Sequence, residues 1–105
     1  MTGFAVSLPS PLLVTGGWTP AVNAVLLKWD ASPNPNLLHY EVRACIGTTY
    51  KVTNEFSVAL LNPGILQWQG TVGVPSSGAK CVYRVYVILT TGNERGSNNL
   101  PVTRP

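Results

Sequence analysis

The chain has 105 residues, of which 45% are apolar, and its seven Lys or Arg against four Asp or Glu leave a net charge of +3. This length fits one domain, and the apolar fraction excludes a disordered, highly charged chain. Only 10% of the residues are charged, against roughly 25% in a typical soluble domain, which argues against strong nonspecific binding to nucleic acid and favours a surface that contacts other proteins.

Residues 1–11 are predicted to form an extended, proline-bearing arm that precedes a domain over residues 12–105. The amino terminus has neither a basic region nor a long apolar stretch, so no secretory signal peptide is visible. The longest strictly apolar run, Val85 to Leu89, is far shorter than the roughly 20 residues of a membrane-spanning helix. We therefore expect the protein to stay in the cytoplasm where it is made, or to leave it by assembly or lysis.

The first half of the domain predicts three strands. Short alternating segments recur between Gly and Pro residues, which is typical of an all-β fold. Residues 12–15 are expected to form an edge strand, because Pro9 and Pro11 precede it, and Gly16-Gly17 to end it. Further strands are expected at 24–30 and 38–46. Their inward residues are predicted to be Val25, Leu27, Trp29, Leu38, Tyr40, Val42 and Ala44, with His39, Glu41, Arg43 and Cys45 pointing outward.

The second half is less regular before it ends in the strongest strand. A short strand is expected at 50–53, and another where Phe56, Val58 and Leu60 alternate, followed by a turn at 62–64. A strand bent at Gly70 is predicted to carry Leu66, Trp68, Val72 and Val74 on one face. Residues 80–90 form the strongest predicted strand, residues 91–99 a polar loop, and Leu100 with Val102 a last edge strand. The inward face of the strongest strand is predicted to be Cys81, Tyr83, Val85, Val87 and Leu89.

About seven short strands in roughly 100 residues predict a sandwich of two antiparallel sheets. Over about residues 9 to 105 the chain resembles a fibronectin type III domain. The segments that carry the resemblance are 12–14, 25–30, 38–43, 83–87 and 91–98. The resemblance implies that the Tyr83 hydroxyl reaches an upstream backbone group in a tyrosine corner. The expected core residues are Trp29, Tyr40, Val42, Tyr83, Val85 and Val87. Within residues 47–74 an extra hairpin or another Ig-like topology stays open.

Residues able to support catalysis or bind a metal are few and scattered. His39 stands alone in the outward phase of its strand, whereas a metal site or a catalytic base needs partners. The carboxylates fall on separate predicted elements, and no glycine-rich segment matches a phosphate-binding loop. The basic residues lack interleaved aromatic residues. We therefore expect no enzyme activity, no metal, no cofactor and no binding of nucleic acid or membrane.

The two cysteines, Cys45 and Cys81, leave two alternatives open. In the resembled topology the third and sixth strands are antiparallel neighbours, which brings the two thiols close enough for a disulfide. Strand phase opposes the disulfide, because Cys45 alternates outward with Arg43 and Cys81 inward with Tyr83. A bulge in either strand would remove this objection.

The candidate interface is the outward row of the sixth strand, Val82, Arg84, Tyr86 and Ile88, because most of this row is apolar on a surface that should meet water. Trp18, in the predicted loop between the first two strands, is a second exposed aromatic candidate. The alternatives are that the row lies under the domain's own loops and that Trp18 caps the end of the core.

The favoured function is a non-catalytic interaction module. Our first hypothesis is a bacteriophage virion protein, structural or decorating, that docks on a capsid or tail lattice. Its partners would then be other virion subunits, and the module could be homo-oligomeric or lattice-bound. The alternative is a carbohydrate- or cell-surface-binding module from a larger extracellular protein, with Trp18 and Trp68 stacking on sugar rings. An integrin-type adhesion role lacks support because the loop at 93–96 has no Arg-Gly-Asp.

Overall fold

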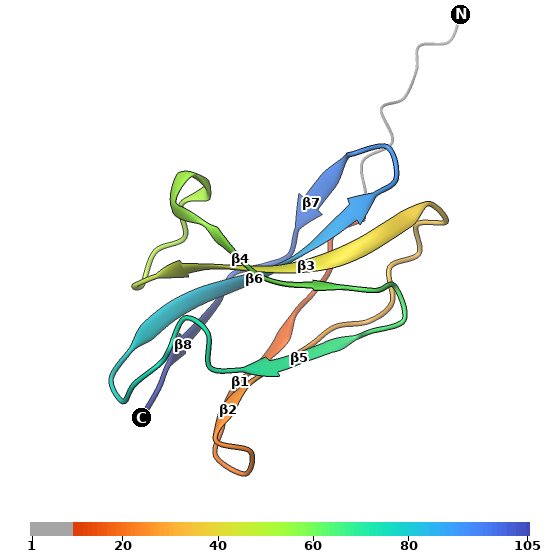
Figure 1. The fold of residues 1–105 in the computed structure, drawn as a ribbon. Helices are drawn as coiled ribbons and strands as arrows, with labels where there is room; N and C mark the ends of the chain where they lie inside the picture. Colours follow the sequence, from red (N-terminus) through yellow and green to blue (C-terminus); the bar gives the residue numbers. More distant parts are fainter. Residues whose placement is uncertain (1–9) are drawn as a thin grey trace, which may run out of the picture.

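The computed structural model describes residues 10–105, which form two facing β-sheets (Figure 1). Of the arm predicted at residues 1–11, all but the last two residues lie outside the described part. The described residues contain eight strands and one short 3₁₀ helix, η1: β1 (Thr15–Thr19), β2 (Ala24–Lys28), β3 (Leu37–Ile46), η1 (Val52–Asn54), β4 (Phe56–Leu61), β5 (Gln67–Gly70), β6 (Lys80–Leu89), β7 (Glu94–Gly96) and β8 (Leu100–Thr103). No helix in residues 10–105 is long and apolar enough to cross a membrane.

The small sheet has the strand order β1-β2-β5, and the large sheet has the order β4-β3-β6-β7, with β8 also pairing with β6. Every pairing is antiparallel. The prediction of an all-β sandwich of two antiparallel sheets is therefore confirmed. The structure adds β7, which lies within the predicted polar loop at 91–99 and pairs with the far end of β6.

One side of the sandwich is closed where β1 of the small sheet contacts β8 of the large sheet. The side-chain amide of Asn98 binds the segment that leads into β1. Its Oδ1 accepts a hydrogen bond from the Val14 backbone N–H at 2.8 Å, and its Nδ2 donates to the Val14 carbonyl at 3.1 Å. On the other side, the edge strands β4 and β5 belong to different sheets and follow each other in the chain.

The core lies between the sheets and contains the residues expected there. Trp29, Tyr40, Val42, Tyr83, Val85 and Val87 are all buried. The rings of Trp29 and Tyr40 meet edge to face, with 5.6 Å between their centroids. The hydroxyl of Tyr83 donates a 2.6 Å hydrogen bond to the carbonyl oxygen of Val72, which is the geometry expected of a tyrosine corner.

The first strand is displaced from its predicted position. Strand β1 begins at Thr15, and Gly16 and Gly17 lie inside it. The backbone of Gly16 has a φ of +125°, and a Cβ there would collide with the carbonyl oxygen of Leu26 on β2. Gly16 is thus required by the close approach of the two strands, whereas the sequence pattern indicated the end of a strand.

The remaining differences from the predicted strands lie within residues 47–74 and at the start of β3. Where a strand was predicted at 50–53, residues 50–51 form a loop and residues 52–53 belong to η1. Leu60, which was predicted to share a face with Phe56 and Val58, is 63% exposed, because a register shift between Val42 and Arg43 adds a residue on β4 and reverses its alternation. The predicted bent strand ends at Gly70, and Val72 is exposed. A register shift at the start of β3 likewise leaves Leu38 exposed.

Candidate functional site

The predicted exposed row on β6 is largely covered. Val82 is 2% exposed and Tyr86 is 7% exposed, while Arg84 and Ile88 are half-buried. Residues 47–55 lie over part of this row, since the Sγ of Cys45 donates a hydrogen bond to the Lys51 carbonyl, and Cys45 stands opposite Val82 in the sheet. Val82 and Tyr86 are therefore not exposed interface residues, and the alternative of cover by the domain's own loops applies to them.

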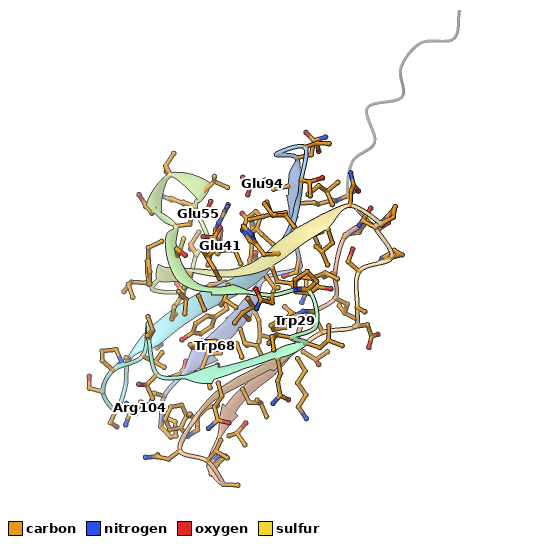
Figure 2. The ribbon with its side chains drawn as sticks, turned by 45° about the vertical axis from the view of Figure 1, so that its right-hand side comes forward. Trp29, Glu41, Glu55, Trp68, Glu94 and Arg104 are labelled. Atoms are coloured by element: carbon orange, nitrogen blue, oxygen red, sulfur yellow. The ribbon has the colours of Figure 1, made fainter. Side chains whose placement is uncertain are left out.

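Most of the protein's carboxylates surround one guanidinium on the outward face of the large sheet. Arg43 contacts Glu41 at 2.5 Å, Glu55 at 3.0 Å and Glu94 at 2.6 Å. Figure 2 shows these three glutamates on the same side of the molecule. The guanidinium also lies over the ring of Tyr86, 4.0 Å from its centroid. We call Arg43, the three glutamates, Tyr50 and Tyr86 the Arg43 cluster.

The Arg43 cluster favours the ionised form of Glu55. Burial alone would raise the pKa of Glu55, but hydrogen bonds from the hydroxyls of Tyr50 and Tyr86 and the charge of Arg43 outweigh it and hold the pKa below its usual value. Burial and the hydrogen bond to Glu55 raise the pKa of Tyr50. The cluster therefore joins the 47–55 segment to β3, β6 and β7 by charged hydrogen bonds.

Arg84 stands directly opposite Arg43 in the sheet but has different partners. Its guanidinium lies 3.9 Å from the centroid of the Tyr50 ring, and its Nε donates to Oδ1 of Asn99 at 2.6 Å. Within residues 10–105 it has no carboxylate within ion-pair distance.

The two cysteines are free thiols and both are buried. Cys81 points into the core, whereas Cys45, which stands opposite Val82, lies on the outward face under the 47–55 segment. No bulge interrupts β3 or β6 between these residues, so the two thiols point to opposite faces of the sheet. The disulfide that the sequence left open is absent. Burial raises the pKa of Cys81 to about 11.

The two tryptophans considered as sugar platforms face inward. Trp18 lies in β1 opposite the buried Val25 and not in a loop, and the guanidinium of Arg104 lies 4.9 Å from its ring centroid. Trp68 lies in β5 opposite Leu27, between the sheets, with its ring 5.7 Å from that of Tyr83 (Figure 2). Both are half-buried against the core, so the alternative that Trp18 caps the core applies.

An open groove of about 730 Å³ lies at one end of the small sheet and was not predicted from the sequence. It is lined by Leu13, Thr15, Lys28, Trp29, Asp30, Gly64, Ile65, Leu66 and Gln67. Thr15, Lys28 and Gln67 are register partners on three adjacent strands and form a polar row across its floor. Exposed aliphatic side chains of Leu13, Ile65 and Leu66 lie beside the row. These residues come from three distant segments, so only a correct strand register could have identified them.

His39 lies near the start of β3, in register with Ile88. Residues 10–105 contain no group of three or more His, Cys, Asp or Glu side chains placed to hold a metal ion.

Comparison with known proteins identifies the fold but gives no close relative. The chain matches no protein-family model and no curated protein. It is similar to an Fn3-like protein from Clostridium thermocellum, with a TM-score of 0.69 and 20% identity, covering 94% of this chain and 96% of that one. The fold is thus Fn3-like, as the resemblance implied.

The same fold occurs as part of larger enzymes. A pectate lyase from Erwinia chrysanthemi, solved in complex with tetragalacturonic acid, matches with a TM-score of 0.72 and 17% identity over 88% of this chain. A β-1,2-glucanase from Parabacteroides distasonis matches with a TM-score of 0.60 and 20% identity over 95% of this chain. The chain spans 28% and 14% of those proteins, respectively. At these identities the matches show a shared fold, and they give the virion hypothesis no support.

Proposed function

We propose that this Fn3-like domain is a non-catalytic accessory module that binds polysaccharide in the groove at the end of the small sheet. The observation that carries the proposal is the polar row of Thr15, Lys28 and Gln67 beside exposed aliphatic side chains. The occurrence of the same fold within a pectate lyase and a β-1,2-glucanase supports polysaccharide as the ligand class.

The groove combines the groups that a sugar chain needs. The hydroxyl of Thr15 and the amide of Gln67 can each donate and accept hydrogen bonds, and the ammonium of Lys28 donates three. Residues opposite each other on adjacent strands have Cβ atoms roughly 5 Å apart, so the row presents its polar groups at short, regular intervals. The aliphatic side chains beside it, including Leu13 at 71% exposure, offer apolar surface to the C–H faces of a sugar ring.

The volume and charge of the groove fit a segment of a chain. Small-molecule sites typically measure about 300–1,000 Å³, which includes the volume found here. Lys28 has no carboxylate within ion-pair distance among residues 10–105. The groove also contains Asp30, whose carboxylate can accept hydrogen bonds from sugar hydroxyls. Oligogalacturonate and β-1,2-glucan oligomers are therefore the first ligands to test.

The experiment is calorimetric titration of the domain with both oligomers, comparing Gln67→Ala with Gln69→Ala. Both glutamines are exposed on β5 and point to the same face, but only Gln67 lines the groove. We expect Gln67→Ala to weaken binding of at least one oligomer by about tenfold, corresponding to roughly 1.4 kcal/mol for lost hydrogen bonds, and Gln69→Ala to bind like the unaltered domain. Absence of binding to either oligomer, or equal effects of the two substitutions, would refute the proposal.

Docking on a virion lattice stays a prediction. Its candidate interface row included Val82 and Tyr86, which are buried. The extended arm predicted at residues 1–11 lies almost entirely outside residues 10–105.

A further inference from the structure

We propose that a second surface, the cationic face formed by Lys51, Lys80 and Arg84, binds the carboxylates of an acidic polysaccharide. It lies on the outward surface of the large sheet, whereas the groove lies at the end of the small sheet. The inference rests on the proposed function, from which it takes polysaccharide as the ligand class. It adds a second binding site and requires that the sugar carry carboxylates.

The fold brings these three cations onto one surface. Lys80 and Arg84 lie on either side of Val82 along β6, and all three residues point outward. The rise of a strand places the Cα atoms of Lys80 and Arg84 about 13 Å apart. Lys51 belongs to the 47–55 segment, and its carbonyl accepts a 3.2 Å hydrogen bond from the Sγ of Cys45. Because Cys45 stands opposite Val82 in the sheet, this bond places the segment beside Val82. Lys51 and Lys80 are exposed.

No side-chain carboxylate among residues 10–105 lies within ion-pair distance of these three cations. Glu41, Glu55 and Glu94 contact Arg43, which stands opposite Arg84 on the neighbouring strand, and the remaining side-chain carboxylate, Asp30, lines the groove. Both oxygens of Glu55 are engaged, Oε1 by Arg43 and Oε2 by two tyrosine hydroxyls. Within residues 10–105, the three cations of the face therefore have no ion pair.

The guanidinium of Arg84 is fixed in position and has N–H groups that can bind an external anion. Stacking on Tyr50 and the bond from Nε to Asn99 fix its guanidinium, and its Nη1 has only a long contact of 3.4 Å with the Tyr86 hydroxyl. Arg84 stands opposite Arg43, but the three glutamates pair with Arg43 and none with Arg84. A ligand carboxylate on the remaining N–H groups of Arg84 would form a bidentate pair.

The surroundings favour a sugar polymer over a peptide or a nucleic acid. Asn99 and Thr103 add polar groups along the neighbouring strand. Val82, the apolar residue at the centre, is covered and offers no pocket for a peptide side chain. The guanidinium of Arg84 occupies one face of the Tyr50 ring, which removes that face as a platform for base stacking.

The test is calorimetric titration with oligogalacturonate and with its methyl ester, which presents the same sugars without their charge. We expect the acid to bind more tightly than the ester, with a difference that shrinks as salt is raised. The double variant Lys51→Gln/Lys80→Gln should lose roughly two- to thirtyfold in affinity for the acid, as expected for two solvent-exposed charge pairs, and nothing for the ester. Arg95→Gln, which removes an exposed cation on β7, is the control and should bind both ligands normally.

The outcomes separate this inference from the proposed function. Equal binding of acid and ester, or unchanged binding of the acid by the double variant, overturns the cationic face and leaves polysaccharide binding in the groove intact. If neither ligand nor β-1,2-glucan binds, both proposals fail. A poly-glutamate peptide or an oligonucleotide that binds more tightly than oligogalacturonate, with loss in the double variant, replaces the sugar by another polyanion and also overturns the inference.

Discussion

Trp29 joins the core to the groove, because it is 5% exposed and also lines the groove. Its indole N–H has no hydrogen-bond acceptor among residues 10–105, so its contribution comes from packing, including its contact with Tyr40. Trp29→Ala should destabilise the domain by about 3–5 kcal/mol through lost transfer free energy and a residual cavity. Trp29→Phe should cost less, since it keeps an aromatic ring and loses no hydrogen bond. Chemical denaturation measures both changes, and an unaltered midpoint for Trp29→Ala would contradict the core assignment.

The thiols give a second test at the residue scale. Because Cys45 and Cys81 are free and buried, we expect two labelled thiols per chain under non-reducing, denaturing conditions and slow labelling of the native domain. Reductant should leave the melting temperature unchanged. Since burial raises the pKa of Cys81 to about 11, the part of the stability that depends on its neutral thiol is present below pH 9 and is lost as the pH rises through 11. Cys81→Ala should remove that part of the alkaline loss, and a single labelled thiol, or none, would contradict the free-thiol assignment.

At the scale of elements, the Arg43 cluster ties the 47–55 segment to β3, β6 and β7. The pKa of Glu55 is lowered in the folded state, so its contribution to stability is present above the ordinary carboxyl pKa of 4.5 and is lost as the pH falls through the lowered value. We therefore expect Glu55→Gln to be less stable than the unaltered domain at pH 7 and to show a smaller further loss between pH 5 and pH 2. Thermal melts over this range measure the difference. Parallel acid profiles for the two proteins would mean that Glu55 does not carry this effect.

Strand β1 depends on a glycine that the sequence pattern misplaced. Gly16→Ala should destabilise the domain by roughly 1–3 kcal/mol, because its φ is +125° and a Cβ would meet the backbone of Leu26. Gly64→Ala is the control, since Gly64 has an ordinary φ and open space around it. Comparison of their denaturation midpoints tests this difference. Equal stability of the two variants would show that β1 does not approach β2 as closely as described.

These elements show where sequence patterns are sufficient. Strict alternation in β6 correctly identified the face that points into the core. Every second residue from Cys81 to Leu89 lies on that face, and all of them are buried. Alternation failed at β4, where the register shift opposite Val42 reverses the phase, and at Gly16, where a glycine serves close strand contact. It also could not show that Tyr86 is covered, since Glu55 and Arg43 reach it from other strands or segments.

For the whole molecule, the two proposed binding surfaces lie on different sheets. The groove depends on register between β1, β2 and β5, and the cationic face on the folding of residues 47–55 over β6. Neither arrangement is visible in the sequence, which is why the exposed-aromatic hypothesis selected Trp18 and Trp68, both directed inward. That the low content of charged residues marks an interaction module stays a prediction. The structure adds that Glu41, Glu55 and Glu94 pair with Arg43 and that Asp30 lines the groove, so none of these side chains forms an ion pair with Lys51, Lys80 or Arg84.

The most direct test of polysaccharide binding in the groove is a titration of the isotope-labelled domain with oligogalacturonate and β-1,2-glucan oligomers, followed by the backbone amide resonances. We predict that at least one oligomer shifts the resonances of residues that line the groove, at 13, 15, 28–30 and 64–67. The amides at the opposite end of the small sheet, at residues 21–23, should not shift. No shift with either oligomer, or shifts confined to residues outside the groove, would contradict the account.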